Sequence, residues 1–338
     1  MEKEWKALYE AARDFRDHRP WSWMSDADLF GVQNPYNGEI GYCCVLGELG
    51  EVFALAVYSG SEGLEGYLRM QSGEFDVDDP DVMHIQKCLV ASFEDRDRLE
   101  EHDYNVIKKL GLKFRGRNAW PQFRSFLPGY VPWHLTKDEV KFLTIALRQA
   151  VNVSLRFKRD QDLLSPPDED LLLIRFPDEK GKSDWIDVWM EIPEPEKSES
   201  PAGQVDELRL KRIGKNLTNR KGIWEIESFY FPGAVEEGER PFFPRTFVVA
   251  DHASGLILDF WIDPPWESFA NLQANLLNFF EKSEILPEGI FVSKYDIFEL
   301  LKPIASGLNI DIETVGELNA VEEFKSEMYS SSFDIPGD

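Results

Sequence analysis

The spacing of apolar residues predicts several amphipathic helices. Residues 3–17 carry apolar side chains at intervals of three and four, which places them on one helical face. Thr136 and Glu139 match a capping box, in which a hydroxyl and a carboxylate satisfy the free amides at the start of a helix, here over 137–150. Further helices are predicted over 62–70, 95–112, 267–281, 295–308, the last interrupted or ended near Pro303, and about 319–328.

Runs of continuous or alternating apolar residues predict strands between these helices. Residues 42–60 predict two strands joined near Gly47 and Gly50, and therefore a hairpin. Residues 243–263 predict a second strand, turn and strand. Single strands are predicted over 87–93, 153–157, 171–176, 185–192, 208–213, 223–231, 289–293 and 310–315.

The two predicted hairpins begin a similar order of elements. A shift of 205 positions places Gly50 on Gly255 and Glu62 on Glu267. Each hairpin is then followed by helix, strand, helix, short strand and helix, with the short strand over 112–114 in the first half and over 310–315 in the second. This order predicts an α+β fold of two sheet-plus-helix units, produced either by duplication or by two ordinary layers that share a common order.

Composition shifts along the chain predict the domain limits. We expect an N-terminal α+β domain over 1–152 and a strand-rich C-terminal α+β domain over 153–330. Residues 191–207 include three prolines and six acidic residues. Such a segment cannot bury enough apolar surface to offset its ordering, so it predicts a flexible loop. The Ser-rich residues 331–338 predict a frayed tail.

The charge of the chain limits the function classes. It has 62 Asp and Glu against 37 Lys and Arg, a net charge of −25, and 43% hydrophobic residues, as in a globular protein. Phosphate backbones and anionic lipids repel such a chain, so general nucleic-acid binding and membrane attachment are not expected. No apolar run approaches the roughly 20 residues of a membrane helix, and the start has no signal-peptide pattern. We expect a cytoplasmic protein.

Few residues have the spacing of a metal or disulfide site. Cys43, Cys44 and Cys88 match neither a zinc motif nor a disulfide framework. Asp251, His252 and Ser254 are close neighbours, whereas a catalytic triad needs groups that converge from separate elements. These three residues predict a hairpin turn with side chains capping backbone amides. We therefore expect no metal and no other cofactor.

Residues 108–124 form a basic and aromatic segment within this acidic chain. Arg115, Arg117, Trp120 and Arg124 are the candidates for binding an anionic ligand or a partner protein, because guanidinium groups beside aromatic faces suit anion recognition. The alternative is that the arginines pair with the chain's own acids while Trp120 covers a core.

Residues 243–328 resemble the ribonuclease H-like core of integrases and transposases, where a β-meander precedes alternating helices and strands. The resemblance rests on FVVADHASG from 247 and on the strand, helix and strand over 289–315. It implies a first carboxylate at Asp251 and a last one at Glu322 or Glu323. In that superfamily such carboxylates hold two divalent metal ions, Mg or Mn, for phosphodiester cleavage.

This chain departs from the pattern of the superfamily after the later strand. Ser293 and Lys294 stand where an Asp is expected, and a lysine opposes metal binding electrostatically. Asp296 is displaced by two or three residues.

Residues 108–133 and 243–261 also resemble uncharacterised bacterial proteins with domains of unknown function. This resemblance implies a bacterial cytosolic protein and no assigned chemistry. We expect a non-catalytic interaction or regulatory module. The alternative is a metal-dependent, ribonuclease H-like nuclease or phosphodiesterase.

Overall fold

The chain forms two α+β units, each built on a mixed sheet. A computed structural model describes residues 2–73, 80–178, 185–193 and 206–332. One unit contains residues 1–128 and 132–196, and the other contains residues 129–131 and 197–338. The described part holds eight α-helices and two sheets, which confirms the expected α+β class. None of its helices is long and apolar enough to cross a bilayer.

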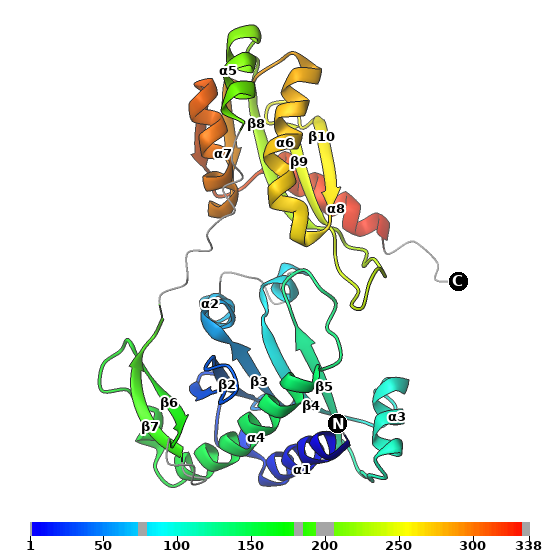
Figure 1. Ribbon diagram of the computed structural model, residues 1–338, viewed down its shortest axis with the longest axis vertical. Helices are drawn as coiled ribbons and strands as arrows, with labels where there is room; N and C mark the ends of the chain where they lie inside the picture. The colour runs from blue at the N-terminus through cyan, green and yellow to red at the C-terminus, as the bar shows by residue number, and fades with distance from the viewer. Residues whose placement is uncertain (1, 74–79, 179–184, 194–205, 333–338) are drawn as a thin grey trace. The chain divides into compact units, whose positions relative to one another are not determined.

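The first unit contains a seven-stranded sheet (Figure 1). Its strands are β1 (Phe30–Gln33), β2 (Ile40–Leu46), β3 (Ala54–Ser59), β4 (Cys88–Glu94), β5 (Trp120–Phe126), β6 (Leu171–Pro177) and β7 (Trp185–Glu191). Their order is β5-β4-β3-β2-β1-β6-β7. Only β1 and β6 pair in parallel among the described strands of this sheet, and the expected hairpin is β2–β3.

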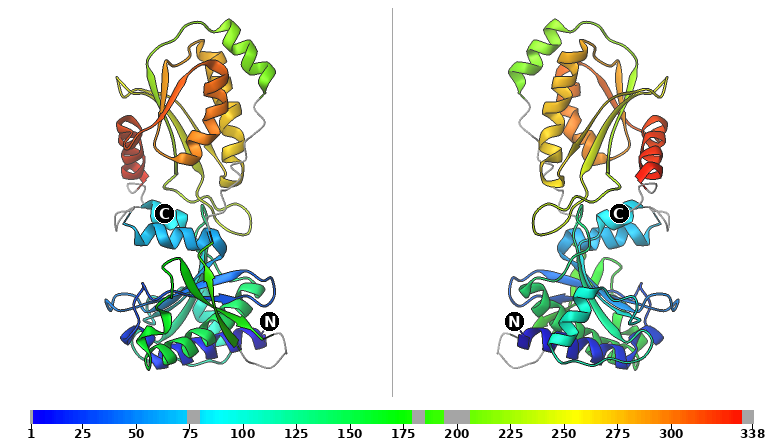
Figure 2. Two further views of the ribbon diagram at one scale, coloured as in Figure 1. Left: turned by 90° about the vertical axis from the view of Figure 1, so that its left-hand side faces the viewer. Right: turned by 90° about the vertical axis from the view of Figure 1, so that its right-hand side faces the viewer.

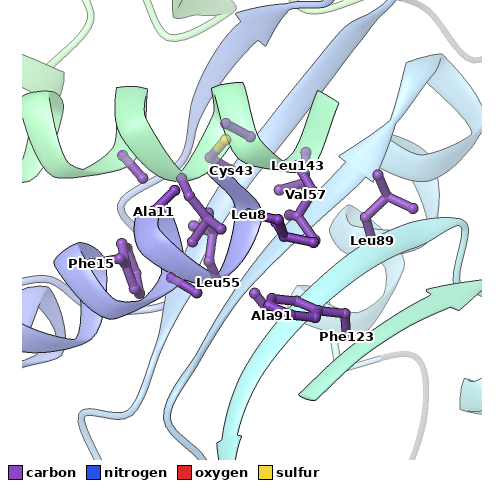
Figure 3. Packing of buried hydrophobic residues seen from close by; sticks show 14 of the residues in the cluster. Leu8, Ala11, Phe15, Cys43, Leu55, Val57, Leu89, Ala91, Phe123 and Leu143 are labelled. Atoms are coloured by element: carbon purple, nitrogen blue, oxygen red, sulfur yellow. The ribbon is translucent and has the colours of Figure 1, made fainter. Parts of the chain in front are cut away.

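Two long helices cover one face of this sheet, and a shorter helix covers part of the other. α1 (Glu2–His18) and α4 (Lys137–Phe157) pack on the first face, where Leu8 and Leu143 meet Leu55 and Val57 of β3 (Figure 3). α2 (Gly60–Gln71) packs on β2, β3 and β4 from the other side. α3 (Glu101–Lys109) and the short helices η1 (Pro20–Ser22), η2 (Pro80–Ile85) and η3 (Gln161–Leu164) lie in the connections.

The second unit contains a five-stranded sheet. Its strands are β8 (Ile223–Tyr230), β9 (Arg245–Asp251), β10 (Ile257–Asp263), β11 (Gly289–Val292) and β12 (Asp311–Thr314), in the order β10-β9-β8-β11-β12. β8, β9 and β10 form an antiparallel meander, and β11 and β12 continue the sheet in parallel with β8. β8 is therefore the central strand.

The helices of the second unit lie on both faces of its sheet. α5 (Glu207–Asn216), α6 (Pro265–Ser283) and α7 (Tyr295–Leu308) share one apolar core with the sheet. α8 (Asn319–Ser332) packs on the opposite face against Phe229 and Val248 (Figure 2). Successive residues of β8 therefore point alternately toward α6 and α7 or toward α8.

Two segments predicted as strands are helical. Residues 153–157 form the last turns of α4, because Ala150, Val153 and Phe157 continue its buried face at helical spacing. Residues 208–213 belong to α5, where Asp206 caps the first turn and Leu210 and Ile213 are buried.

The order of elements recurs, but the pairing of strands does not. Each hairpin, β2–β3 or β9–β10, is followed by helix, strand, helix, strand and helix. The strand predicted over 112–114 is wrong, because those residues lie in the loop after α3 and the strand of the first unit is β5 instead. In the first unit β4 pairs antiparallel with β3, the second strand of the hairpin. In the second unit β11 instead pairs in parallel with β8, on the other side of the meander. The 205-residue shift therefore aligns element order and not sheet topology.

The domain boundary expected after residue 152 is wrong. It falls inside α4, and β6 and β7 join the first sheet through β1, so the first unit continues to Glu196. The flexible loop predicted over 191–207 falls mainly on 194–205, outside the described residues; its ends lie in β7 and at the start of α5. Of the tail predicted over 331–338, only the end of α8 is described.

Candidate functional site

The central strand of the second sheet carries two buried glutamates. Trp224 and Ile226 of β8 point toward α6 and α7 and belong to the apolar core there. The alternation of the strand places Glu225 and Glu227 on the face that α8 covers. Their exposed fractions are 0% and 3%. Buried carboxylates require partners, so their surroundings define the first candidate site.

Glu225 joins three elements of the second unit. One carboxylate oxygen accepts hydrogen bonds from the backbone N–H groups of Ala320 and Val321, at 2.9 and 3.2 Å. These amides belong to the first turn of α8, where a negative charge is favourable. The other oxygen lies 2.6 Å from Nδ1 of His252, just after β9. Glu225 therefore fixes α8 and the turn after β9 to the central strand.

Glu227 occupies the point where β11 ends and α7 begins. Its Oε2 accepts hydrogen bonds from the backbone N–H groups of Ser293 and Lys294, both at 2.9 Å, and from Oγ of Ser293 at 2.6 Å. Its Oε1 accepts from the N–H of Ser228 at 2.8 Å. Four donors of the chain thus surround this carboxylate, and a metal ion would have to displace several of them.

Two cations lie at the carboxyl end of β8. Nζ of Lys294 donates to the carbonyl oxygen of Ser228 at 2.5 Å. The Arg245 guanidinium donates to the hydroxyl of Tyr230 at 2.9 Å and lies 3.9 Å from the Asp296 carboxylate. This end of the sheet therefore combines the carboxylates of Glu227 and Asp296 with the cations of Lys294 and Arg245. The two cations reduce the attraction of this site for a divalent metal ion.

Asp251 caps its own turn, as the turn interpretation predicts. Its Oδ1 accepts hydrogen bonds from the N–H and Oγ of Ser254, at 2.9 and 2.6 Å. The Ser254 hydroxyl and amide hold the pKa of Asp251 below its ordinary value. Asp251 also shares the strand parity of Phe247 and Val249, which places it on the α6 and α7 face of the sheet.

Glu322 and Glu323 lie exposed on α8, which covers the opposite face of the sheet from that of Asp251. Within the described ranges, no three His, Cys, Asp or Glu side chains are grouped so that they could hold a metal ion. The structure therefore does not gather Asp251, Glu322 and Glu323 into one metal site.

The first strand of the meander is β8 and not the segment that contains Asp251. The ribonuclease H-like resemblance covers residues 243–328 only, so it does not include Glu225 and Glu227 of the strand predicted over 223–231. A signal was present in the run IWEIESFY at 223–230, where two glutamates alternate with Trp and Ile inside a strand. Such alternation at the centre of a covered sheet indicates buried carboxylates.

The basic segment of the first unit divides into buried and exposed residues. Arg124 is buried and forms ion pairs with Asp103 and Glu100, each at 2.7 Å. Trp120 is half-buried and its ring lies 6.0 Å from that of Phe114. For these two residues the structure agrees with pairing to the chain's own acids and covering a core.

Arg115 and Arg117 remain exposed in the loop between α3 and β5. The Arg117 Nε lies 3.9 Å from the Asp95 carboxylate, while Arg115 forms no salt bridge to any described residue. Lys108, Lys109 and Lys113 are also exposed nearby in the sequence. Lys108 and Lys109 end α3, and the other three residues lie in the loop after it. We call these five cationic residues, all between 108 and 117, the basic loop.

The fold and sites define a two-unit α+β protein with a basic loop on one unit and buried carboxylates in the other. A family model described as "Domain of unknown function (DUF7309)" matches residues 5–175, half of the chain, so the chain belongs to that family. A model described as "Domain of unknown function (DUF6930)" matches residues 209–329. No curated protein matches the chain.

Two solved structures are similar to part of the chain. One is a simian T-cell lymphotropic virus intasome in complex with PP2A regulatory subunit B56 gamma, with 16% identity and a TM-score of 0.25 over 36% of this chain. The chain covers less than half of that chain, 45%. The other is the catalytic core domain of BIV integrase, with 12% identity and a TM-score of 0.22 over 34% of this chain and 74% of that chain.

Proposed function

We propose that this protein is a non-catalytic interaction module, and that its second unit is a ribonuclease H-like fold whose acidic positions have become structural. The order of a β-meander followed by alternating helices and strands supports this fold assignment. The hydrogen bonding of Glu227 carries the proposal for the site. Its carboxylate accepts from Ser228, Ser293 and Lys294, at the strand end where the superfamily resemblance implies metal ligands.

A two-metal nuclease needs carboxylates that are free to bind cations. In this chain Glu225 caps α8, Glu227 caps the start of α7 and Asp251 caps its own turn. Lys294 adds a positive charge at the end of β11. These four observations favour an interaction module over the nuclease or phosphodiesterase alternative.

The basic loop is the surface that we assign to an anionic partner. Its cations are exposed in a chain of net charge −25, and Arg115 forms no salt bridge within the described part. The overall negative charge repels long phosphate backbones, whereas a short acidic protein segment can contact the loop alone. We therefore propose an acidic segment of a partner protein as the ligand.

A cleavage assay tests the non-catalytic assignment. Labelled single-stranded and duplex nucleic acids are incubated with the full chain in MgCl₂ or MnCl₂. We expect no cleavage above that of the Asp251→Asn variant. Metal-dependent cleavage by the wild-type chain that disappears in Asp251→Asn would support the nuclease alternative and contradict our proposal.

A binding assay tests the basic loop. A fluorescent poly-glutamate peptide is titrated with the wild-type chain and with the double variant Arg115→Ala, Arg117→Ala. We expect the double variant to bind about fivefold or more weakly and with a smaller salt dependence, since two exposed charges are lost. The control removes two other exposed arginines, Arg148→Ala and Arg159→Ala, and should leave binding unchanged. An equal loss of peptide affinity in both double variants would mean that the peptide is attracted by exposed positive charge in general, and it would contradict the assignment of the basic loop as the binding site.

A further inference from the structure

One row of apolar side chains on the first sheet is exposed. Ile186, Val188 and Met190 lie along one face of β7, with exposed fractions of 52%, 38% and 37%. Their partners across the β6–β7 ladder are apolar residues that extend the same surface, namely Phe176, Ile174 and Leu172. α2 covers this face over β2, β3 and β4. Over β6 and β7 no described element covers it to a comparable degree.

β7 is also an edge strand. It is the last strand in the sheet order and, among the described strands, pairs with β6 alone (Figure 1). The N–H of Ile192 donates to the carbonyl of Asp170, which fixes the hydrogen-bonded positions of this antiparallel ladder. Alternation along the strand then turns the backbone groups of Asp187, Trp189 and Glu191 away from β6. These groups are available to another strand.

A groove of about 410 Å³ adjoins this apolar row. Ile40, Leu172, Ile174 and Met190 contribute apolar lining. The sheet can bring Ile40 and Ile174 together above β1 because Gly31 lies between them, and a Cβ there would meet Ile174 at 2.3 Å. The apolar surface is therefore continuous from β2 to β7.

The border of the groove is acidic. Glu39 and Glu191 line it and form no salt bridge with any described residue, while Lys87 is paired with Glu62 at 2.8 Å. Asp187, also on β7, is paired with Arg156 and Arg175. An incoming segment therefore meets an apolar floor and unpaired backbone groups, and on the opposite face of β7, where alternation places Glu191, a carboxylate that forms no salt bridge with a described residue.

We propose that β7 binds an extended segment of a partner protein in which apolar and basic side chains alternate. The segment adds a strand to the sheet through the backbone of Asp187, Trp189 and Glu191, as in other cases of strand addition. Its apolar side chains lie beside Ile186 and Val188, and its basic side chains on the face of Glu191.

A second copy of the chain fits this surface less well. Pairing two β7 strands would bring two acidic borders together, and each chain has a net charge of −25. A basic partner segment instead brings cations to the face of Glu191. Charge complementarity thus selects the partner segment over self-association.

The test uses the full chain and a labelled synthetic peptide in which Lys and Val alternate. Its dissociation constant is measured by fluorescence anisotropy. Two control peptides are a Ser–Val alternating peptide and the Lys–Val peptide with a central proline, which cannot complete the ladder. We expect binding of the Lys–Val peptide, with both controls at least about tenfold weaker.

Variants locate the binding surface. Val188→Lys removes an exposed apolar contact and should weaken binding about tenfold, and Glu191→Lys should weaken it about twofold to fivefold. The matched controls lie on edge strands of the second sheet: Ile262→Lys on β10 and Glu313→Lys on β12, both exposed, which should change nothing. For each variant, a midpoint temperature of thermal unfolding equal to that of the wild type shows that the variant is folded.

Several results would overturn the proposal. These are no binding of the Lys–Val peptide, equal binding of all three peptides, or equal effects of Val188→Lys and Ile262→Lys. A wild-type dimer in light scattering that becomes a monomer in Val188→Lys would identify a second copy as the occupant. Peptide binding that appears only after replacement of residues 194–205 by a Gly–Ser linker would identify the chain's own segment.

Discussion

The two glutamates of β8 show how a buried charge is accommodated when the chain supplies enough donors. Transfer of a carboxylate from water into the interior costs several kcal/mol. Hydrogen bonds to a charged group contribute about 1.5 to 3 kcal/mol each, so the four donors around Glu227 can offset that cost. The charged carboxylate of Glu227 therefore stabilises the second unit only while these four donors are hydrogen-bonded to it.

Replacing Glu227 by Gln should destabilise the second unit. The amide NH₂ of glutamine must face N–H and O–H donors at one of the two oxygen positions, which leaves buried polar groups unpaired. We expect the free energy of unfolding to fall by about 2 to 4 kcal/mol, measured by urea denaturation. The control Glu313→Gln makes the same change at an exposed strand position and should alter stability by less than about 0.5 kcal/mol. If Glu227→Gln is as stable as the wild type or more stable, the buried charge of Glu227 does not contribute to the stability of the second unit.

The turn after β9 gives a prediction about the pKa of Asp251. Removing the Ser254 hydroxyl in Ser254→Ala should raise the pKa of Asp251 toward its ordinary value of 3.8, because that hydroxyl donates to the charged form. A carboxyl titration by NMR measures the change. Since the folded pKa is lowered, the stabilisation is fully present above the ordinary carboxyl pKa and is lost as the pH falls through the folded value. The stability difference between wild type and variant should therefore shrink in acid; a difference that grows below pH 4 would contradict this assignment.

Local side-chain chemistry could be predicted from the sequence where the partners are near in the chain. The capping box of Thr136 and Glu139 is present, and Asp251 caps its turn through Ser254, three residues away. The role of Glu227 could not be predicted in the same way, because its partner Ser293 lies 66 residues along the chain. Only the pairing of β8 with β11 brings the two together.

At the scale of elements, a buried ion pair fixes α3 to β5. Arg124 of β5 donates to both carboxylate oxygens of Asp103, at 2.7 and 3.1 Å, and both side chains are largely buried. Asp103 belongs to the first turns of α3, and Glu100 just before the helix also pairs with Arg124. The arginine therefore contributes to stability and is not free to bind a ligand.

Arg124→Ala should lower the free energy of unfolding by about 3 to 5 kcal/mol, because it leaves the buried Asp103 carboxylate without its cation. Arg115→Ala, in the exposed loop before the same strand, should change it by less than about 0.5 kcal/mol. Chemical denaturation of both variants measures the difference. Similar small effects in both would show that the Arg124 pair is energetically neutral, and Arg124 would become a binding candidate again.

The types of most elements follow from apolar spacing, but the neighbours of each strand do not. Both units show hairpin, helix, strand, helix, strand and helix, yet β4 joins the hairpin's second strand while β11 joins the strand before the hairpin. The ribonuclease H-like resemblance therefore began at residue 243, one strand after β8, although 223–231 was predicted as a strand. The choice of neighbour depends on which faces the helices cover, a long-range property that periodicity does not contain.

At the scale of the whole molecule, the described residues of each unit form their own apolar clusters, one on either face of the unit's sheet. The boundary could not be placed from composition alone, because β6 and β7 return to the first sheet beside β1 after the long α4. A strand-rich stretch after a helix resembles a new domain in sequence, and only the parallel pairing of β1 with β6 assigns it to the first unit.

The separate apolar clusters of the two units predict independent unfolding. Hydrogen exchange followed by mass spectrometry should show faster exchange only in peptides of the second unit for Glu227→Gln, and only in peptides of the first unit for Arg124→Ala. Faster exchange across both units in either variant would mean that the chain unfolds as one cooperative body.

We propose that the carboxylates of the second unit serve its structure and hold no metal ions. Crystals of the full chain soaked in MnCl₂ test this directly through the anomalous difference map. We expect no manganese peak beside Glu225, Glu227, Asp251, Glu322 or Glu323, with the Ser293 and Lys294 bonds to Glu227 intact. A pair of peaks bridged by Glu227 or Asp251, with Lys294 turned away, would contradict the claim and restore the nuclease alternative.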